Sequence, residues 1–307
     1  MQKYIIAIHG GAGTILKKHL SLEQETAYHE ALREALELGH EVLNKKGTAI
    51  EAVTQAVESM EDSPLFNAGK GAVYSNEGKN EMEASIMEGK NLNAGAVAGI
   101  SNIKNPIQLA KTILHDPEFV YLIGHGAEEY AEKRKLDKVS SEYFRTKFRE
   151  EQWLAAKSEG KVILDHDADK KFGTVGAVAL DSFGDLAAAT STGGLTNKKY
   201  GRIGDSSVIG SGTYANNNTC AISCTGYGEY FLRAVVAYDV ACLMDYKGLS
   251  LADACHEVVM GKLVKMRGEG GLIAVDAKGN YQFSFNSEGM YRGVVGSEVK
   301  LGTYIFK

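Results

Sequence analysis

The sequence predicts an α+β fold in which antiparallel sheets lie between helical layers, and three observations support this prediction. Two capped amphipathic helices follow a short first strand, paired strands dominate the region after residue 173, and helical patterns return later in the chain. Because helices bury one apolar stripe and sheets bury their faces, this succession packs helices onto sheets. The 307 residues allow about two average domains or one large one.

The first half of the chain reads as a strand followed mainly by helices. Residues 4–8 form an apolar strand that runs into a glycine-rich corner at 9–14. Capping boxes at Ser21 with Gln24 and at Thr48 with Glu51 each open an amphipathic helix. Strands are then expected at 81–87 and 94–100, helices at 106–114 and 140–156, and an exposed mobile segment at 157–172.

The second half reads as hairpins followed by helices. Strands are expected at 174–181 and 186–192 around a turn at 182–185, and again at 219–225, 272–275 and 281–285. A broad apolar stripe predicts a helix over 229–246, and Ser250 with Asp253 predicts the start of another.

The composition indicates a folded protein with many tight backbone corners. Hydrophobic residues make up 44% and charged residues 24% of the chain, which excludes intrinsic disorder. The 35 glycines amount to about 11% of the residues, against a usual share near 7%. The net charge of -5 gives no reason to expect a nucleic acid or a membrane as a partner, so we expect neither.

The cysteines and the apolar runs indicate a cytoplasmic protein. The apolar run at 4–8 is too short for a secretory signal, and no run reaches the length of a membrane span. Cys220, Cys224, Cys242 and Cys255 show no pairing framework, and nothing supplies the further ligands that zinc would need. We therefore expect four reduced thiols.

Several common cofactor and catalytic motifs do not fit the sequence. Gly69-Lys70 lacks the following serine or threonine of a phosphate-binding loop. A dinucleotide fingerprint at 210–215 is followed by three asparagines where a helix should begin. The eight histidines are scattered, and only His9 lies beside a glycine-rich corner.

The pair Gly173-Thr174 ends the polar segment and opens a strand. A threonine hydroxyl needs a base, and cleavage before Thr174 would free an α-amine with a pKa of about 7.7–8.0 on the same residue. Gly173 can adopt the strained conformation that attack by Thr174 on the preceding carbonyl demands. On these residues alone, an ordinary strand threonine after a loop is the favoured interpretation.

Seven segments in order carry a resemblance to a known family. They read HGGAG at 9–13, NAGKG at 67–71, EASIMEG at 83–89, FGTVGAVALD at 172–181, STGG at 191–194, RIGDS at 202–206 and TGYGE at 225–229. Together they closely resemble the plant-type (type 2) L-asparaginase and isoaspartyl peptidase family of N-terminal nucleophile hydrolases of the threonine type. The resemblance covers residues 9 to about 233, and the rest of the chain matches the family only in its general residue pattern.

The resemblance implies one αββα domain that cuts itself once. The expected fold is a four-layer sandwich of two antiparallel sheets between helical layers. Autocleavage between Gly173 and Thr174 would leave an α-subunit of residues 1–173, with the mobile linker 157–172 at its end, and a β-subunit of residues 174–307. Two such αβ units are expected to form a homodimer.

The resemblance also implies the catalytic residues. Thr174 is the expected nucleophile, and Thr192 would hydrogen-bond its hydroxyl. Thr225 and the backbone N–H of Gly226 would form the oxyanion hole. Asn67 is expected beside the nucleophile, and no cofactor is expected to take part in catalysis.

The expected substrate is a small molecule that carries an aspartyl group. Arg202 would bind its α-carboxylate and Asp205 its α-ammonium, with Gly226 and Gly228 lining the pocket. Such binding would place a side-chain amide over Thr174, which implies hydrolysis of L-asparagine and β-aspartyl dipeptides through a β-aspartyl-Thr174 ester. Without the resemblance, a surface salt bridge between Arg202 and Asp205 is the favoured interpretation.

A structural sodium ion is implied in the loop after the second helix. Its expected ligands are the main-chain carbonyls of Met60, Glu61, Ser63, Phe66, Ala68 and Lys70. As the alternative, Glu61 and Asp62 are simply a solvated helix end.

Two departures from the family pattern lie near the substrate residues. Glu83 stands where the family usually has aspartate, and Ser207 replaces a common proline behind Asp205. The second departure puts the substrate preference in doubt.

Two other functions remain open. A glycosylasparaginase would share the fold and nucleophile but usually has aspartate, not Gly173, before the threonine and enters the secretory pathway. A homologue that stays uncleaved and only binds acidic amino acids is the other.

Overall fold

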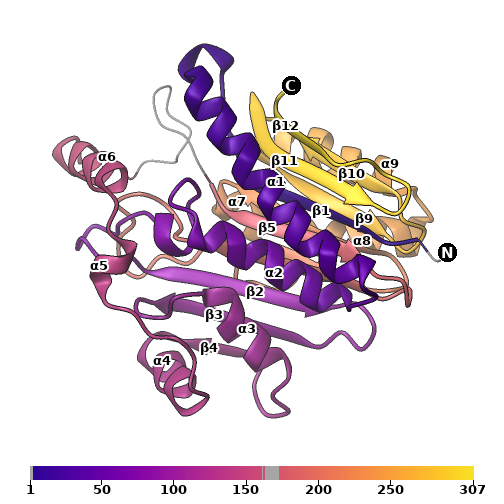
Figure 1. Ribbon diagram of the computed structural model, residues 1–307. Coiled ribbons are helices and arrows are strands. Elements are labelled where there is room, and N and C mark those ends of the chain that lie inside the picture. The colour runs from indigo at the N-terminus through magenta and orange to yellow at the C-terminus, as the bar shows by residue number, and fades with distance from the viewer. Residues whose placement is uncertain (1–2, 161, 163–172) are drawn as a thin grey trace.

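Two sheets packed face to face form the centre of the protein. The computed structural model describes residues 3–160, 162 and 173–307. Within them an eight-stranded and a four-stranded sheet lie between helices on both outer sides, as Figure 1 shows. The predicted α+β sandwich with the layer order αββα is confirmed.

The larger sheet has the strand order β12-β11-β1-β5-β6-β2-β3-β4. In that order the strands span Gly302–Phe306, Gly289–Gly296, Ile5–Gly13, Val175–Leu180, Leu186–Thr192, Met82–Glu88, Ala94–Ile100 and Tyr121–Ile123. Neighbours are antiparallel except β3 and β4, which are parallel. This edge pair is parallel because α3 (Pro106–Leu114) carries the chain back before β4 begins.

The smaller sheet has the order β10-β9-β8-β7 and is antiparallel throughout. Its strands span Tyr281–Phe285, Gly270–Asp276, Cys220–Gly226 and Thr213–Ala215. Alternation along β1 shows how the two cores are separated. Ile6 and Ile8 lie in the core under the outer helices, whereas Ile5 and Ala7 lie in the core that the two sheets share.

Helices cover both outer faces. On the larger sheet lie α1 (Leu22–Asn44), α2 (Ala49–Asp62) and α3, and on the smaller one α8 (Val236–Lys247), α9 (Leu251–His256), the π-helical η3 (Glu257–Leu263) and α10 (Val264–Met266). Shorter elements are η1 (Lys17–His19), η2 (Gly69–Gly71), α4 (Gly124–Lys133), α5 (Ser141–Phe144), α6 (Lys147–Ser158) and α7 (Gly228–Ala234). The predicted capping boxes before α1 and α2 and the Ser250 cap of α9 are confirmed.

Three predicted elements differ from the structure. The predicted glycine corner at 9–14 lies mostly inside β1, where the pairing register shifts between His9 and Ala12. The helix expected over 140–156 is broken into α5 and α6, because Thr146 caps the second helix. The helix expected over 229–246 is interrupted at Val235, whose φ of 50° is left-handed.

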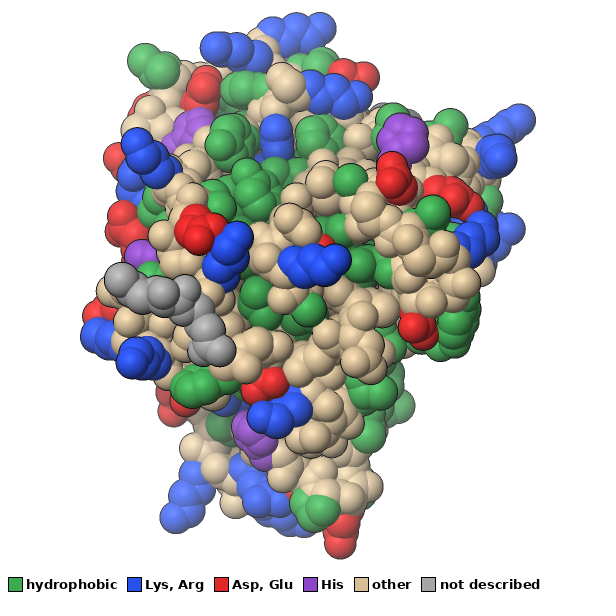
Figure 2. Space-filling model, turned by 90° about the vertical axis from the view of Figure 1, so that its right-hand side faces the viewer, with side chains coloured by type: hydrophobic (Ala, Val, Ile, Leu, Met, Phe, Trp, Pro, Cys, Tyr) green, Lys and Arg blue, Asp and Glu red, His purple; other side chains and the backbone are tan. Residues whose placement is uncertain are grey.

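The surface, the cysteines and the lengths of the helices bear on the remaining expectations. In Figure 2, side chains of both charge signs are interspersed over the face shown. The four cysteines lie within the described residues and are free thiols; Cys242 is partly exposed and the others are buried. Among the residues that the structure describes, no helix is long and apolar enough to cross a membrane. Most of the predicted mobile segment 157–172 lies outside the described residues.

Chain segments on either side of Gly173 interleave in the larger sheet. Strands β1 to β4 precede Gly173, and β5, β6, β11 and β12 follow it. β1 pairs with β11 on one edge and with β5 on the other. The segment 1–173 therefore contributes a strand that lies between two strands of the segment 174–307.

Asp181 joins the β5–β6 turn to the start of α2. Its Oδ1 accepts the N–H groups of Phe183 and Asp185 at 2.9 and 3.0 Å, and its Oδ2 accepts the N–H of Ala49 at 2.9 Å. We expect Asp181→Ala to lower the free energy of unfolding by about 2 kcal/mol, because buried N–H groups lose their acceptor. Urea unfolding would measure this loss.

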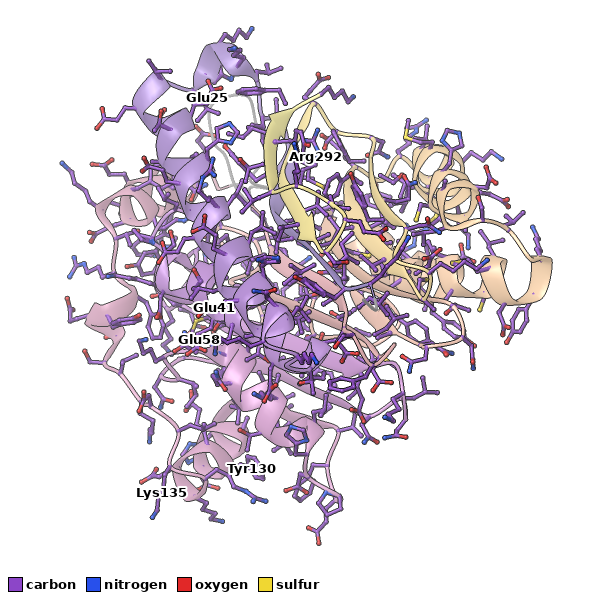
Figure 3. The ribbon with its side chains drawn as sticks, turned by 45° about the vertical axis from the view of Figure 1, so that its right-hand side comes forward. Glu25, Glu41, Glu58, Tyr130, Lys135 and Arg292 are labelled. Atoms are coloured by element: carbon purple, nitrogen blue, oxygen red, sulfur yellow. The ribbon has the colours of Figure 1, made fainter. Side chains whose placement is uncertain are left out.

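The matched control is Glu41→Ala on α1, labelled in Figure 3. Glu41 pairs with Lys45 on the surface, and both side chains are more than half exposed. This change should leave the free energy of unfolding close to that of the parent, because an exposed ion pair contributes little to stability. Equal losses in the two variants would contradict the role given to Asp181.

Candidate functional site

Thr174 lies one residue before β5, directly after Gly173, and is 8% exposed. The register of β5 and β6 pairs Val175 with Ser191, so Thr192 lies next to Thr174 on the neighbouring strand. The Thr192 hydroxyl accepts the Gly194 N–H at 3.0 Å, which leaves its own proton to be donated elsewhere. The contact recorded for the Thr174 hydroxyl is with Ser206 Oγ, at 3.4 Å.

A buried chain of polar groups ends on the carbonyl oxygen of Thr174. Because a carbonyl only accepts, His9 donates from Nδ1 at 3.0 Å, and its Nε2 then accepts from Ser223 Oγ at 2.9 Å. Ser223 in turn accepts from Thr190 at 2.7 Å, and Thr190 accepts from Thr213 at 2.5 Å. Burial lowers the pKa of His9 to about 3, although the bond to Thr174 opposes this shift. The imidazole is therefore neutral and its tautomer is fixed.

Thr225 and the shifted part of β1 lie against the Gly173-Thr174 bond. A Cβ placed on Gly173 would be 3.1 Å from Thr225 Oγ1, and one placed on Gly11 would be 2.6 Å from the nitrogen of Gly173. The Ala12 N–H donates to Thr225 Oγ1 at 3.3 Å. A polar hydroxyl and close-packed backbone thus surround the bond that is expected to be cut.

Gly226 follows Thr225 at a point where backbones approach closely. A Cβ there would be 2.5 Å from Glu269 O, and its φ of 153° is one that side chains rarely adopt. The position therefore requires glycine, and its N–H is on the strand end beside Thr225.

Asn67 holds the loop after Thr192. Its Nδ2 donates to Gly194 O at 2.8 Å, and its backbone carbonyl accepts the Gly193 N–H at 3.1 Å. Its Oδ1 accepts the Val73 N–H at 3.0 Å. The side chain is 1% exposed, and it acts on Thr192 through the adjoining glycines rather than on Thr174 directly.

Arg202, Asp205 and Gly228 lie together. A Cβ on Gly228 would be 2.6 Å from Arg202 Nη2 and 2.9 Å from Asp205 Oδ1, so the missing side chain leaves space between the two charged groups. Arg202 forms a bidentate ion pair with Glu229, with Nε–Oε1 and Nη2–Oε2 distances of 2.9 and 3.0 Å. Arg202 therefore pairs with Glu229, and not with Asp205 as in the surface salt bridge that the residue spacing left open.

Asp205 is buried and incompletely paired. It is 3% exposed, and its Oδ2 has no hydrogen-bond partner among the described residues. Burial raises the pKa of this carboxyl from 3.8 to about 7, against the lowering effects of its own N–H and of Arg202. Glu83 and Glu229 raise it further. Such a buried acceptor is suited to a cationic ligand group.

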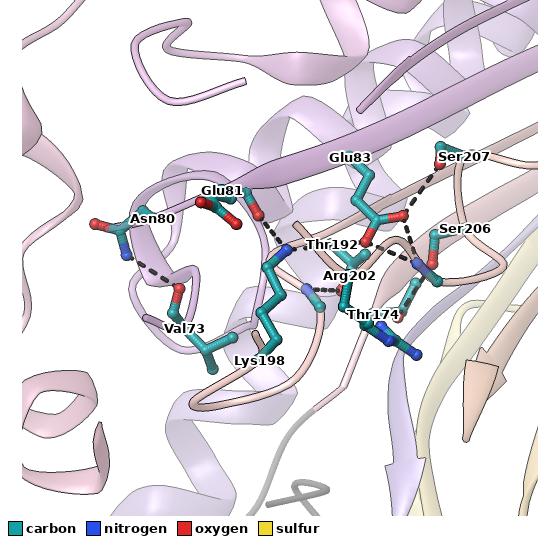
Figure 4. A network of polar contacts seen from close by, with 12 residues as sticks. Val73, Asn80, Glu81, Glu83, Thr174, Thr192, Lys198, Arg202, Ser206 and Ser207 are labelled. Carbon is teal, nitrogen blue, oxygen red and sulfur yellow. Dashed lines mark hydrogen bonds and ion pairs between the residues drawn. The ribbon is translucent and has the colours of Figure 1, made fainter. Parts of the chain in front are cut away.

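Figure 4 shows the polar groups around Thr174, Thr192 and Arg202, among which Glu83 and Lys198 were not assigned a role from the sequence. Ser206, Ser223 and Glu229 were not assigned one either, although Ser206 and Glu229 lie inside quoted segments. His9 was singled out only for its neighbouring glycines, and that signal did lead to a residue in contact with Thr174.

The loop after α2 offers main-chain oxygens to a cation. Pro64 has no N–H, so it cannot pair with the carbonyl of Met60 at the helix end. A Cβ on Gly69 would collide with Glu61 O, and a Cβ on Gly71 would collide with Phe66 O. The Ala68 carbonyl, in contrast, accepts the Gly71 N–H at 3.1 Å. Main-chain carbonyls gathered near the negative end of a helix fit a hard monovalent cation.

Comparisons with known proteins agree with these features. A family model described as asparaginase matches residues 2–305. The isoaspartyl peptidase of Escherichia coli (strain K12) is 52% identical over 99% of this chain and 97% of that protein. The isoaspartyl peptidase of Salmonella typhimurium (strain LT2) is 51% identical over 99% of each chain. The probable isoaspartyl peptidase/L-asparaginase 2 of Arabidopsis thaliana is 40% identical over 95% of this chain and 96% of that protein.

The burial of Asp205 predicts a pH-dependent loss of stability. Its pKa in the folded protein lies above that in the unfolded chain, so the folded state holds a proton that the unfolded state loses between about pH 4 and 7. This group therefore favours folding less as the pH rises through that window. We expect Asp205→Asn to be about as stable as the parent at pH 4 and about 2–4 kcal/mol more stable at pH 8.

Urea unfolding at several pH values would measure the difference. Asp239→Asn is the control, because Asp239 forms a partly exposed ion pair with Lys262 on α8 and η3. A stability difference between Asp205→Asn and the parent that does not change from pH 4 to pH 8 would contradict the prediction.

Proposed function

Because the chain belongs to the asparaginase family, we propose that it hydrolyses the β-aspartyl amide bonds of isoaspartyl dipeptides and of L-asparagine. The observation that carries this proposal is the space between Arg202 and Asp205 at Gly228. A cationic side chain and a buried carboxylate on either side of that space suit the carboxylate and ammonium of one amino-acid head group. Such a head group leaves the side-chain amide, not an α-amide, to reach Thr174.

The proposed chain of events begins with a cut before Thr174. Its hydroxyl attacks the Gly173 carbonyl, and as the ester forms the amide C–N bond breaks and frees the α-amine of Thr174; water then hydrolyses the ester, which leaves a carboxylate on Gly173 and restores the Thr174 hydroxyl. Thr225 supports this step, since its hydroxyl lies beside Gly173. His9 fixes the Thr174 carbonyl and thereby the orientation of the residue that must attack.

The substrate reaction then uses the freed amine as the base. The amine accepts the hydroxyl proton as Thr174 attacks the side-chain carbonyl of the substrate, and it returns a proton to the departing ammonia or amino acid. Water hydrolyses the β-aspartyl-Thr174 ester and releases L-aspartate. Thr225 and the Gly226 N–H are the proposed donors to the oxyanion in both halves.

Arg202 must bind a second carboxylate in this scheme. Its Nε and Nη2 are engaged with Glu229, whose side chain is 42% exposed. The substrate α-carboxylate therefore either uses the remaining Nη1 face or displaces Glu229 toward solvent. The bidentate contact with Glu229 supports the assignment, because it is the geometry that a substrate carboxylate would adopt.

The alternatives make different demands on the chain. The three relatives named above carry the words isoaspartyl peptidase in their names, which favours that substrate class over glycosylated asparagine. A binding-only homologue would need the same Arg202–Asp205 pair but not the buried contacts around Gly173 and Thr174. Those contacts favour an enzyme.

Location and assembly are part of the same proposal. Four free thiols fit a reducing compartment such as the cytoplasm. A homodimer of αβ units follows from the family resemblance, and light scattering of the purified protein would test it. The carbonyls of Met60, Glu61, Ser63, Phe66, Ala68 and Lys70 remain the proposed sodium ligands, supported most directly by Met60, Glu61 and Phe66.

Replacement of Thr174 tests both the cut and the reaction. Thr174→Ala should remain a single 33.1 kDa chain and lose at least about 10³-fold in asparagine hydrolysis, because it lacks the nucleophile. The parent should yield two fragments that end at 173 and begin at 174. Mass spectrometry and an ammonia-release assay are the measurements.

Thr174→Ser is the matched control, since it retains a hydroxyl and should retain cleavage and some turnover. Substantial asparagine hydrolysis by Thr174→Ala would overturn the choice of nucleophile. A folded parent chain that never cleaves would instead favour the binding-only alternative.

Sodium should stabilise the protein through the loop after α2. We expect the unfolding midpoint to rise with NaCl and to saturate, relative to choline chloride at equal ionic strength, because a bound ion favours the folded state. Gly69→Ala should remove this response, since a Cβ there meets Glu61 O.

Gly248→Ala is the control for that experiment. Its φ of 65° also disfavours a side chain, but no atom lies within 4 Å of the added Cβ and the residue ends α8. It should lower stability and keep the sodium response. Equal midpoints of the parent in the two salts would contradict a sodium site.

A further inference from the structure

Asp205 lies in a turn whose backbone is held from both sides by one strand. Among the described residues its Oδ2 has no hydrogen-bond partner, so the held backbone of the turn contributes to where that oxygen points. The neighbours of Asp205 in the chain, Gly204 and Ser206, each contact a side chain of β2. Those side chains are Glu83 and Ser85, which lie two residues apart and therefore on one face of the strand.

Glu83 holds the turn before Asp205. Both of its carboxylate oxygens lie 3.0 Å from the Gly204 nitrogen, and Oε2 accepts the Ser207 hydroxyl at 3.1 Å. The side chain is fully buried. Its charge faces the buried ammonium of Lys198 at 4.0 Å, and Lys198 itself donates to Glu81 O at 2.7 Å. A buried carboxylate with these partners is a fixed point in the site.

Ser85 holds the turn after Asp205. Its hydroxyl lies 2.6 Å from the Ser206 carbonyl oxygen and 2.7 Å from Thr213 Oγ1. Ser206 also provides the hydroxyl that contacts Thr174. The contacts from β2 therefore hold the backbone on both sides of Asp205, and one of the two held neighbours, Ser206, also contacts Thr174.

Tyr121 extends the contact to the edge of the sheet. Its hydroxyl lies 2.6 Å from Ser207 Oγ. Because Glu83 can only accept, Ser207 donates to it, and Tyr121 then donates to Ser207. The Tyr121 ring, from β4, is 40% exposed, so its hydroxyl can be removed with little loss of packing.

We propose that Glu83, Ser207 and Tyr121 are positioning residues that fix the Asp205 carboxylate for the α-ammonium of the substrate, and so determine the preference for substrates that carry this group. The inference rests on the proposed function. It gives a role to the two positions where the sequence departs from the family pattern. Those two side chains contact each other, and the hydroxyl of Ser207 makes a contact that proline could not.

The test compares two amides that differ only in the α-amino group. L-Asparagine carries it, and succinamic acid does not. The ratio of kcat/KM for the first to that for the second measures how much the α-ammonium contributes, and Asp205→Asn gives the ratio without a carboxylate. We expect this ratio to fall about 10-fold in Glu83→Gln and about 3-fold in Ser207→Ala and Tyr121→Phe, mainly through KM for asparagine. The rate of cleavage at Gly173 should change less than about twofold, since that step uses no ammonium.

The controls remove equivalent groups elsewhere. Tyr130→Phe removes a hydroxyl that donates to Asp116 on the far side of α3, and Tyr130 is labelled in Figure 3. Ser287→Ala removes a buried hydroxyl that donates to Gly289 O. Both should leave the ratio unchanged.

Each outcome decides between the possibilities. If Glu83→Gln fails to fold, Ser207→Ala and Tyr121→Phe carry the test. Suppose that the parent prefers asparagine but the variants lower kcat/KM for both amides by the same factor. This result would overturn the inference and leave the proposed function standing. A cleaved parent that hydrolyses neither amide would overturn the proposed function, and the inference with it.

Discussion

The position of strand β5 between β1 and β6 is the constraint on which the candidate site depends. Hydrogen bonds on both edges of β5 leave Thr174, one residue before Val175, little freedom to move. The His9 bond to its carbonyl removes rotation of the following peptide. The other candidate residues reach Thr174 from strand ends or turns that are held by the same two sheets. Small displacements of a nucleophile are costly to catalysis, so a rigid strand is a suitable support.

Burial of charge in this site lowers stability in return for binding. Glu83 and Lys198 face each other with both side chains buried, Arg202 pairs with Glu229, and Asp205 retains an oxygen with no partner among the described residues. An unsatisfied buried carboxylate has no role in a core that serves only folding. Local departures from packing rules of this kind gather where a ligand completes the pairing.

Local signals in the sequence predicted the elements that depend on local interactions. Capping boxes span three residues, and they placed the starts of α1 and α2 correctly. β11 and β12 were missed because β11 has three glycines and an arginine in eight residues, and both strands are stabilised by partners far along the chain. Motifs likewise brought the expected site residues together. The pairs that organise them, Arg202 with Glu229 and Glu83 with Gly204, join residues 27 and 121 positions apart, and no spacing rule indicates such contacts.

The interleaving of the larger sheet has a consequence for molecularity. While the chain is intact, β1 and its neighbours β5 and β11 unfold together as one molecule. After a cut before Thr174, β1 belongs to one polypeptide and both neighbours to another, so complete unfolding releases two separate molecules. Reassembly then requires two polypeptides to associate, which costs translational entropy. Dilution therefore favours the dissociated state. If the proposed cut occurs after folding, the intact chain forms this sheet without that bimolecular step.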